Sequence, residues 1–259
     1  MREILLTILL GIIQGLTEFL PVSSSGHLTL FSEIFNLGEN TLFTAVALHF
    51  GTLMAVVVYY FKDLINLFKP ENHKTIGHLA LATLPAGLVM LFISGTIESL
   101  FDSSKFISFG FLITGIILIV TDIVGKHIRE TKPLTWKSAL VMGLSQACAV
   151  FPGISRSGST LSGGIILASG ERKQVADFAF LMSIPIILGS TLFELVSVDL
   201  NSINWTATIL GVLASFITGY LAIKFMLKII KKCNFKWFSL YLFVLFVITF
   251  INGFILPIW

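Results

Sequence analysis

Long charge-free stretches are the feature that most constrains how this chain can fold. Six stretches of about 20 residues are apolar and almost free of Asp, Glu, Lys and Arg. One helix of that length spans the hydrocarbon core of a bilayer, and the whole chain has a mean hydropathy of +0.94. The sequence therefore predicts an integral membrane protein, with transmembrane helices at about 41–61, 78–97, 106–124, 176–198, 206–226 and 238–256.

Two further apolar segments, at about 3–32 and 138–169, are each broken near the middle by Pro, Ser and Gly. The breaks read PVSSSGH from position 21 and PGISRSGST from position 152. Each half is too short to cross a bilayer, and irregular backbone at membrane depth is tolerated only where protein or water surrounds it. We expect both segments to form re-entrant helical hairpins, which return to the side they entered.

Basic residues concentrate in three connections between the apolar stretches. They are Lys62, Lys69 and Lys74, then Lys126, Arg129, Lys132 and Lys137, and finally Lys228, Lys231, Lys232 and Lys236. Two spans separate successive clusters if the hairpins are re-entrant, so the positive-inside rule places all three clusters in the cytoplasm. The connections around Glu33, Glu39, Asp102 and Asp199, and both termini, then face outside. The net charge of +3 reflects this topology, and we expect no nucleic-acid partner.

The number of predicted membrane crossings also indicates an inverted-topology repeat. Residues 1–125 and residues 126–259 each contain one hairpin and three spans, and an odd number of crossings turns the second half upside down. Weak internal similarity agrees, because GIIQGLTEFLPVSSSG at 11–26 resembles GLSQACAVFPGISRSG at 143–158. The expected fold class is an all-α integral membrane protein with six transmembrane helices and two re-entrant hairpins.

Few ionisable groups lie within the broken segments. Glu18 and His27 belong to the first segment and Arg156 to the second. Ionisable residues inside a membrane are costly and usually functional. The alternative is a structural Glu18–Arg156 ion pair that joins the two repeats.

Serines and glycines precede a helical run in both broken segments. They are Ser23, Ser24, Ser25 and Gly26, and then Ser155, Ser157 and Gly158. Ordinary helix capping is one interpretation. Two capped helix N-termini that meet near the midplane would also bind an anion, and the planar fork of Arg156 favours phosphate.

Ser24 and His27 are three residues apart, which brings hydroxyl and imidazole together if a helix begins at the tip of the hairpin. A hydroxyl beside a base is the usual form of an activated nucleophile. A structural histidine that forms hydrogen bonds is the alternative.

The two broken motifs resemble a known family. QGLTEFLPVSSSGH at 14–27 and PGISRSGST at 152–160 are similar to the signature segments of the undecaprenyl-diphosphate phosphatases, the BacA or bacitracin-resistance family, and ADFAFLMSIPIILGS from position 176 extends the likeness. The resemblance implies a bacterial plasma-membrane enzyme with an inverted-repeat fold. Such an enzyme hydrolyses undecaprenyl diphosphate to the monophosphate and so recycles the lipid carrier for peptidoglycan and other envelope polymers.

The resemblance also implies roles for single residues. Glu18 is the acidic residue, Ser24 the nucleophile, His27 its partner and Arg156 the phosphate clamp, although the motif leaves open whether serine or histidine attacks. The implied substrate-binding residues are Ser23, Ser25, Gly26, Gln146, Ser155, Ser157, Gly158 and Thr160.

A divalent cation, Mg²⁺ or Ca²⁺, is expected as the cofactor, with Glu18 and Gln14 as its ligands. The typical first motif has an acid at both ends of ExxxE, and Gln14 replaces the first of them. An amide oxygen can still bind a hard cation, but it brings no charge.

The expected partners are a polyprenyl diphosphate and membrane lipid, and a homodimer is compatible with the sequence. The alternative function is a polyprenyl-phosphate flippase or an anion-coupled secondary transporter, because inverted repeats with broken helices are typical of transporters. Ser24, His27 and Glu18 together favour hydrolysis, which we expect at a site that opens to the outside.

Overall fold

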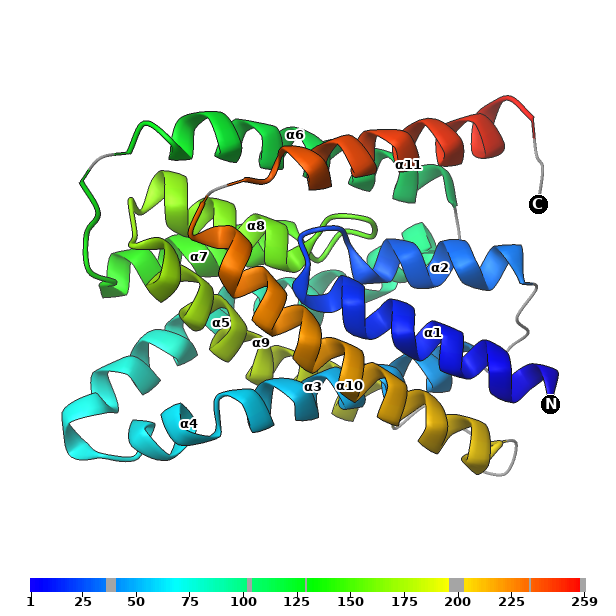
Figure 1. Cartoon of the computed structure of the whole chain (residues 1–259), viewed down its shortest axis with the longest axis horizontal. Helices are drawn as coiled ribbons and strands as arrows, with labels where there is room; N and C mark the ends of the chain where they lie inside the picture. Colours follow the sequence, from blue (N-terminus) through cyan, green and yellow to red (C-terminus); the bar gives the residue numbers. More distant parts are fainter. Residues whose placement is uncertain (36–40, 102–103, 129, 196–202, 233, 257–259) are drawn as a thin grey trace.

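The computed structural model describes residues 1–35, 41–101, 104–128, 130–195, 203–232 and 234–256, which form a bundle of helices (Figure 1). These residues contain no strand, and their only β-type pairing is an isolated bridge between Lys132 and Gly170. The predicted all-helical architecture is confirmed. In chain order the elements are α1 (Arg2–Phe19), α2 (Ser24–Ile34), α3 (Thr41–Tyr59), α4 (Phe61–Leu67), the short helix η1 (Pro70–Asn72), α5 (His73–Phe101), α6 (Ser104–Gly125), α7 (Trp136–Cys148), α8 (Arg156–Ser162), the π-helical turn η2 (Gly163–Leu167), α9 (Arg172–Leu195), α10 (Trp205–Ile230) and α11 (Lys236–Phe254).

Helices α3, α5, α6, α9, α10 and α11 lie where the charge-free stretches predicted spans. In the described part of the chain, five helices are long and apolar enough to cross a membrane, and six if α3 and α4 count as one span. The expected helix over 41–61 ends at Tyr59, where the chain bends by 73° into α4. Large apolar side chains cover the exposed faces of α10 and α11, as contact with lipid requires. They include Ile209, Leu213, Ile217, Leu221, Leu240, Val244 and Val247.

Both broken segments form helical hairpins, which Figure 1 shows in blue and in green. The α1–α2 hairpin opens toward the right of the view, where the N-terminus and the end of α11 lie, and the α7–α8 hairpin opens toward the left. Their turns meet in the middle of the molecule. The arrangement places the two Ser- and Gly-rich breaks side by side, deep between the surrounding helices.

Small residues allow α1 to pack closely against α10. A Cβ atom on Gly15 would lie 2.5 Å from the carbonyl oxygen of Ser215, and one on Gly11 would collide with the backbone of Gly211. Close backbone approach at small residues is a common way for helices to associate in membranes. Deeper in the molecule, the aromatic rings of Phe19, Phe111, Phe180 and Phe235 are fully buried.

The three basic connections lie on the same side of the molecule, at the left of Figure 1. They join α3 to α5, α6 to α7 and α10 to α11. Glu33 lies in α2, at the opposite side. Arg129, Glu39, Asp102 and Asp199 fall outside the described residues.

Candidate active site

The second helix of each hairpin begins with the same kind of serine N-cap. Ser23 precedes α2, and its Oγ accepts a hydrogen bond from the Gly26 N–H at 3.2 Å. Ser155 precedes α8, and its Oγ accepts from the Gly158 N–H at 3.1 Å. Satisfying one of the free N–H groups at a helix start stabilises the helix. The capping interpretation of the serine clusters is therefore confirmed.

Glu18, near the end of α1, interacts with polar side chains from several helices. Its carboxylate is buried, with a side-chain exposure of 3 %. Gln14 Nε2 and Ser24 Oγ donate hydrogen bonds to Oε2, at 2.9 Å and 2.6 Å. Arg156 Nη2 donates to Oε1 at 2.9 Å, and His49 Nε2 lies 3.7 Å from Oε2. One carboxylate thus connects α1, α2, α3 and α8.

Two contacts join the tips of the hairpins. The first is the Glu18–Arg156 ion pair. The second is a hydrogen bond at 2.9 Å that Ser157 Oγ donates to the carbonyl oxygen of Leu20. The Glu18–Arg156 ion pair, which was the structural alternative drawn from the sequence, is present in the structure.

The predicted hydroxyl groups also form contacts within their own turns. Ser25 Oγ lies 3.4 Å from Ser23 Oγ, and Ser157 Oγ lies 3.2 Å from Ser155 Oγ. Thr160 Oγ1 donates to the carbonyl oxygens of the first turn of α8, at 2.9 and 3.1 Å. Ser25 and Thr160 therefore support the turns and do not contact Glu18 among the described hydrogen bonds.

His27 does not pair with Ser24 in the structure. Its Nδ1 lies 2.7 Å from the carbonyl oxygen of Ser23, and its Nε2 lies 2.6 Å from the hydroxyl of Tyr241. Because a carbonyl oxygen only accepts, Nδ1 carries the proton, and Nε2 of the neutral ring accepts from the Tyr241 O–H. In the described part of the chain, Ser24 Oγ bonds to Glu18 instead.

The sequence reasoning missed two residues that reach this network. It assigned no role in the site to His49 on α3, yet this histidine faces the Glu18 carboxylate, and its Nδ1 donates to the carbonyl oxygen of Ala45 at 2.8 Å. It did not consider Tyr241 on α11 at all. The signal for His49 was its position as an ionisable group inside a predicted span. Tyr241 gave no such signal, because tyrosine is common in membrane helices.

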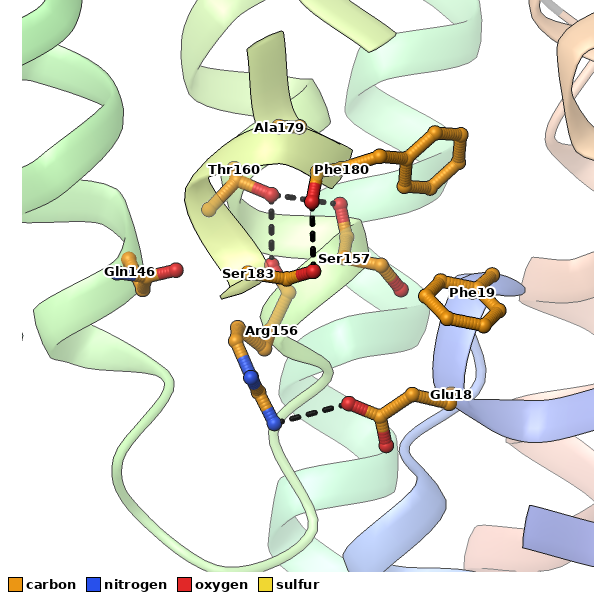
Figure 2. Close-up of a pocket in the computed structure, with 9 residues that line it drawn as sticks. All are labelled: Glu18, Phe19, Gln146, Arg156, Ser157, Thr160, Ala179, Phe180 and Ser183. Atoms are coloured by element: carbon orange, nitrogen blue, oxygen red, sulfur yellow. Dashed lines mark hydrogen bonds and ion pairs between the residues drawn. The ribbon is translucent and has the colours of Figure 1, made fainter. Parts of the chain in front are cut away.

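A small pocket lies beside Arg156 and Glu18, between α1, α7, α8 and α9 (Figure 2). Arg156 Nη1 is buried there and, within the described residues, has no hydrogen-bond partner. The side-chain amide of Gln146 is also buried and equally unpartnered in that part of the chain. Unpaired buried donors are unfavourable unless a ligand or water satisfies them. The pocket is lined by Glu18, Phe19, Gln146, Arg156, Ser157, Thr160, Ala179, Phe180 and Ser183.

The residues expected to hold a divalent cation are adjacent. Gln14 Oε1 is buried with no hydrogen-bond partner in the described chain, and Gln14 Nε2 bonds to the Glu18 carboxylate. The described residues contain no group of three or more His, Cys, Asp and Glu side chains that could hold a metal ion. A pair of protein oxygens fits Mg²⁺, which is commonly bound by one or two carboxylates together with substrate phosphates.

Comparison with known proteins gives a consistent picture. The model of the family described as "Bacitracin resistance protein BacA" matches residues 7–248. The chain is 37% identical over 244 residues to an undecaprenyl-diphosphatase of Halothermothrix orenii, with 92% of this chain and 94% of the relative covered. It is 38% identical over 252 residues to an undecaprenyl-diphosphatase of Thermosipho melanesiensis, with 95% and 98% covered. A third protein of that name, from Alkaliphilus metalliredigens, is 39% identical over 257 residues, with 90% and 93% covered.

Proposed function

The chain belongs to the bacitracin resistance protein BacA family, and on that premise we propose that it hydrolyses undecaprenyl diphosphate to undecaprenyl phosphate and inorganic phosphate. Its relatives carry the name of this phosphatase, and none of these names supports the alternative of a flippase. The apolar helices make it a multi-pass membrane protein, for which we propose the bacterial plasma membrane. The product is the lipid carrier used again in envelope polymer synthesis.

The observation that carries the proposal is the carboxylate of Glu18 between a hydroxyl and a guanidinium. Ser24 Oγ already donates a hydrogen bond to Glu18 at 2.6 Å, and an adjacent base that can take the proton is how a weak serine nucleophile is activated. Arg156 keeps one buried nitrogen, Nη1, without a partner among the described residues. That nitrogen can bind a phosphate oxygen, because guanidinium groups form strong charge-assisted hydrogen bonds to phosphate.

The reaction then follows from these positions. Ser24 Oγ forms a bond to the terminal phosphorus, and the bond from that phosphorus to the bridging oxygen breaks, so undecaprenyl phosphate leaves. The Ser24 proton passes to Glu18. Water then attacks the phosphoserine, and the bond from phosphorus to Ser24 Oγ breaks. Ser24 Oγ takes its proton back from Glu18, and inorganic phosphate leaves with the oxygen and the protons of the water. Arg156 neutralises the charge on the oxygens of the transferred phosphoryl group throughout.

The geometry supports serine, not histidine, as the attacking group. Both nitrogens of the neutral His27 ring are engaged, Nδ1 by Ser23 and Nε2 by Tyr241. Ser24 Oγ keeps lone pairs that can attack. We therefore propose that Glu18 accepts the Ser24 proton during the reaction. His27 supports the turn that carries Ser24.

Glu18 and Gln14 would hold a divalent cation, which when bound supplies further positive charge for the diphosphate oxygens. Gln14 Oε1, which is buried and has no hydrogen-bond partner among the described residues, is the feature that favours this assignment. The substrate phosphates would complete the coordination.

We also propose the topology inferred from the sequence. Residues 1–125 and 126–259 are two inverted repeats, and the α1–α2 and α7–α8 hairpins are re-entrant. The pairing of helices agrees with this, since α1 packs on α10 and its repeat counterpart α7 packs on α5, the counterpart of α10. The termini and the mouth of the site face outside, and a homodimer remains a prediction.

Phosphate release in detergent micelles tests the proposed function, because transport cannot occur there. The purified protein should release phosphate from a polyprenyl diphosphate. Ser24→Ala and His27→Ala should each lower the rate by about a hundredfold or more, while both variants stay monodisperse. A wild-type protein that releases no phosphate would refute the assignment, and near-normal turnover in either variant would remove that residue from the site.

A further inference from the structure

Tyr241 contacts the proposed active site from outside both sequence motifs. It lies on α11, and its hydroxyl is 2.6 Å from Nε2 of His27, a residue 214 positions earlier. The two rings also stack, with centroids 5.6 Å apart and an angle of 19° between their planes. Phe111 of α6 also contacts the imidazole, in an edge-to-face arrangement with the ring centroids 5.6 Å apart. The His27 ring is therefore held where α2, α6 and α11 meet.

We propose that Tyr241 is a positioning residue of the active site, which acts through His27 on the nucleophile Ser24. The hydroxyl of Tyr241 donates to Nε2 and so leaves the proton of the neutral ring on Nδ1. The Nδ1–H group then donates to the carbonyl oxygen of Ser23 at 2.7 Å. This proposal rests on the proposed function.

The turn at Ser23 explains why this support matters. Ser23 has a positive φ of 68°, a backbone conformation that is unfavourable for a residue with a side chain and needs support from its surroundings. It is also the residue that immediately precedes Ser24. Holding its carbonyl oxygen fixes the start of α2, and with it the hydroxyl that must align with the phosphorus. Misplacing a reacting group by a small distance can lower a rate by about a hundredfold.

The first experiment separates positioning from other roles of Tyr241. Tyr241→Phe removes the hydroxyl and keeps the ring, so kcat for a polyprenyl diphosphate should fall by about tenfold or more while KM stays unchanged. In a His27→Ala background, the same substitution should have no further effect. Tyr220→Phe, on α10, is the matched control and should keep wild-type kinetics. A normal kcat in Tyr241→Phe would overturn the proposal, and so would an equal fold-loss in both backgrounds.

A second measurement needs no turnover. In protein with ¹⁵N-labelled histidine, the nitrogen spectrum of His27 should show a protonated Nδ1 and a hydrogen-bonded Nε2, assigned by the signals that His27→Ala removes. Tyr241→Phe should shift the Nε2 signal, and Tyr220→Phe should not. An unchanged Nε2 signal would refute the contact. Because the spectrum is independent of phosphate release, it also distinguishes failure of this proposal from failure of the proposed function.

Discussion

At the scale of single residues, the site depends on the hydrogen bonds and the ion pair that stabilise one buried carboxylate. Glu18 accepts hydrogen bonds from Gln14, Ser24 and Arg156. Removing a partner from a buried charge is strongly unfavourable, because the remaining charge stays desolvated. The same carboxylate is therefore both a structural link between the hairpins and the acceptor for the Ser24 proton.

Arg156→Lys tests whether the shape of the cation matters as well as its charge. A lysine ammonium cannot bond to Glu18 and at the same time present a second, rigidly placed donor to phosphate, as Nη2 and Nη1 of the guanidinium can. We expect kcat/KM to fall by about a hundredfold, measured as phosphate release in detergent. If the lysine variant keeps most of the activity, Arg156 acts only as a source of positive charge.

Gln14→Glu tests the proposed cation ligands. The new carboxylate would lie beside Glu18, so the two negative charges would repel each other until a divalent cation binds between them. Added Mg²⁺ should therefore raise the thermal unfolding temperature of the variant more than that of the wild type, and half-maximal activity should need less Mg²⁺. Equal responses to Mg²⁺ and to chelator in both proteins would place Gln14 outside the coordination sphere.

At the scale of elements, the hairpin α1–α2 is held in place by the close contact of α1 with α10. Gly15 faces Thr218 and the backbone of Ser215, with no room for a side chain. The position of Glu18 depends on this contact, because it lies less than one helical turn further along the same helix. Helix packing and site geometry are thus coupled through α1.

Gly15→Ala should lower the thermal unfolding temperature in detergent by about 5 °C, since the new Cβ forces α1 away from α10. Gly189→Ala on α9 is the matched control, because no atom of the described residues lies within 4 Å of a Cβ added there. It should leave the temperature unchanged or raise it slightly, as alanine favours a helix more than glycine does. Equal shifts in the two variants would show that the α1–α10 contact is not tight.

At the scale of the whole molecule, the two hairpins enter from opposite ends and meet in the middle (Figure 1). The α1–α2 hairpin, which carries Glu18 and Ser24, opens toward the end opposite the basic connections. We propose, from the positive-inside rule, that this end is extracytoplasmic. Moving a diphosphate headgroup across hydrocarbon before hydrolysis would be very costly, so the mouth of the site should lie outside.

Sealed membrane vesicles test this orientation. A short-chain prenyl diphosphate that cannot cross the membrane should be hydrolysed by right-side-out vesicles without permeabilisation. Inverted vesicles should become active only after detergent is added. Activity confined to intact inverted vesicles would reverse the assignment.

The sequence alone was enough to predict the class of fold and the position of most elements. Apolar stretches of membrane-spanning length located α3, α5, α6, α9, α10 and α11, and the Pro, Ser and Gly clusters located both hairpins. The sequence also identified Glu18 and Arg156 as charged residues inside the broken apolar segments, where a charge needs a partner or a function. These features are local, since hydropathy and helix breaking depend on residues that are close in sequence.

Only the tertiary structure decided which of these groups are partners. Side chains on a helix point toward its N-terminus, so His27 turns back to the carbonyl oxygen of Ser23, and the Ser24 hydroxyl is left to Glu18 across the hairpin. His49 and Tyr241 reach the site from α3 and α11 because those helices pack beside α1 and α6. Such contacts depend on how helices distant in sequence pack together, and no periodicity or spacing within one segment reports on them.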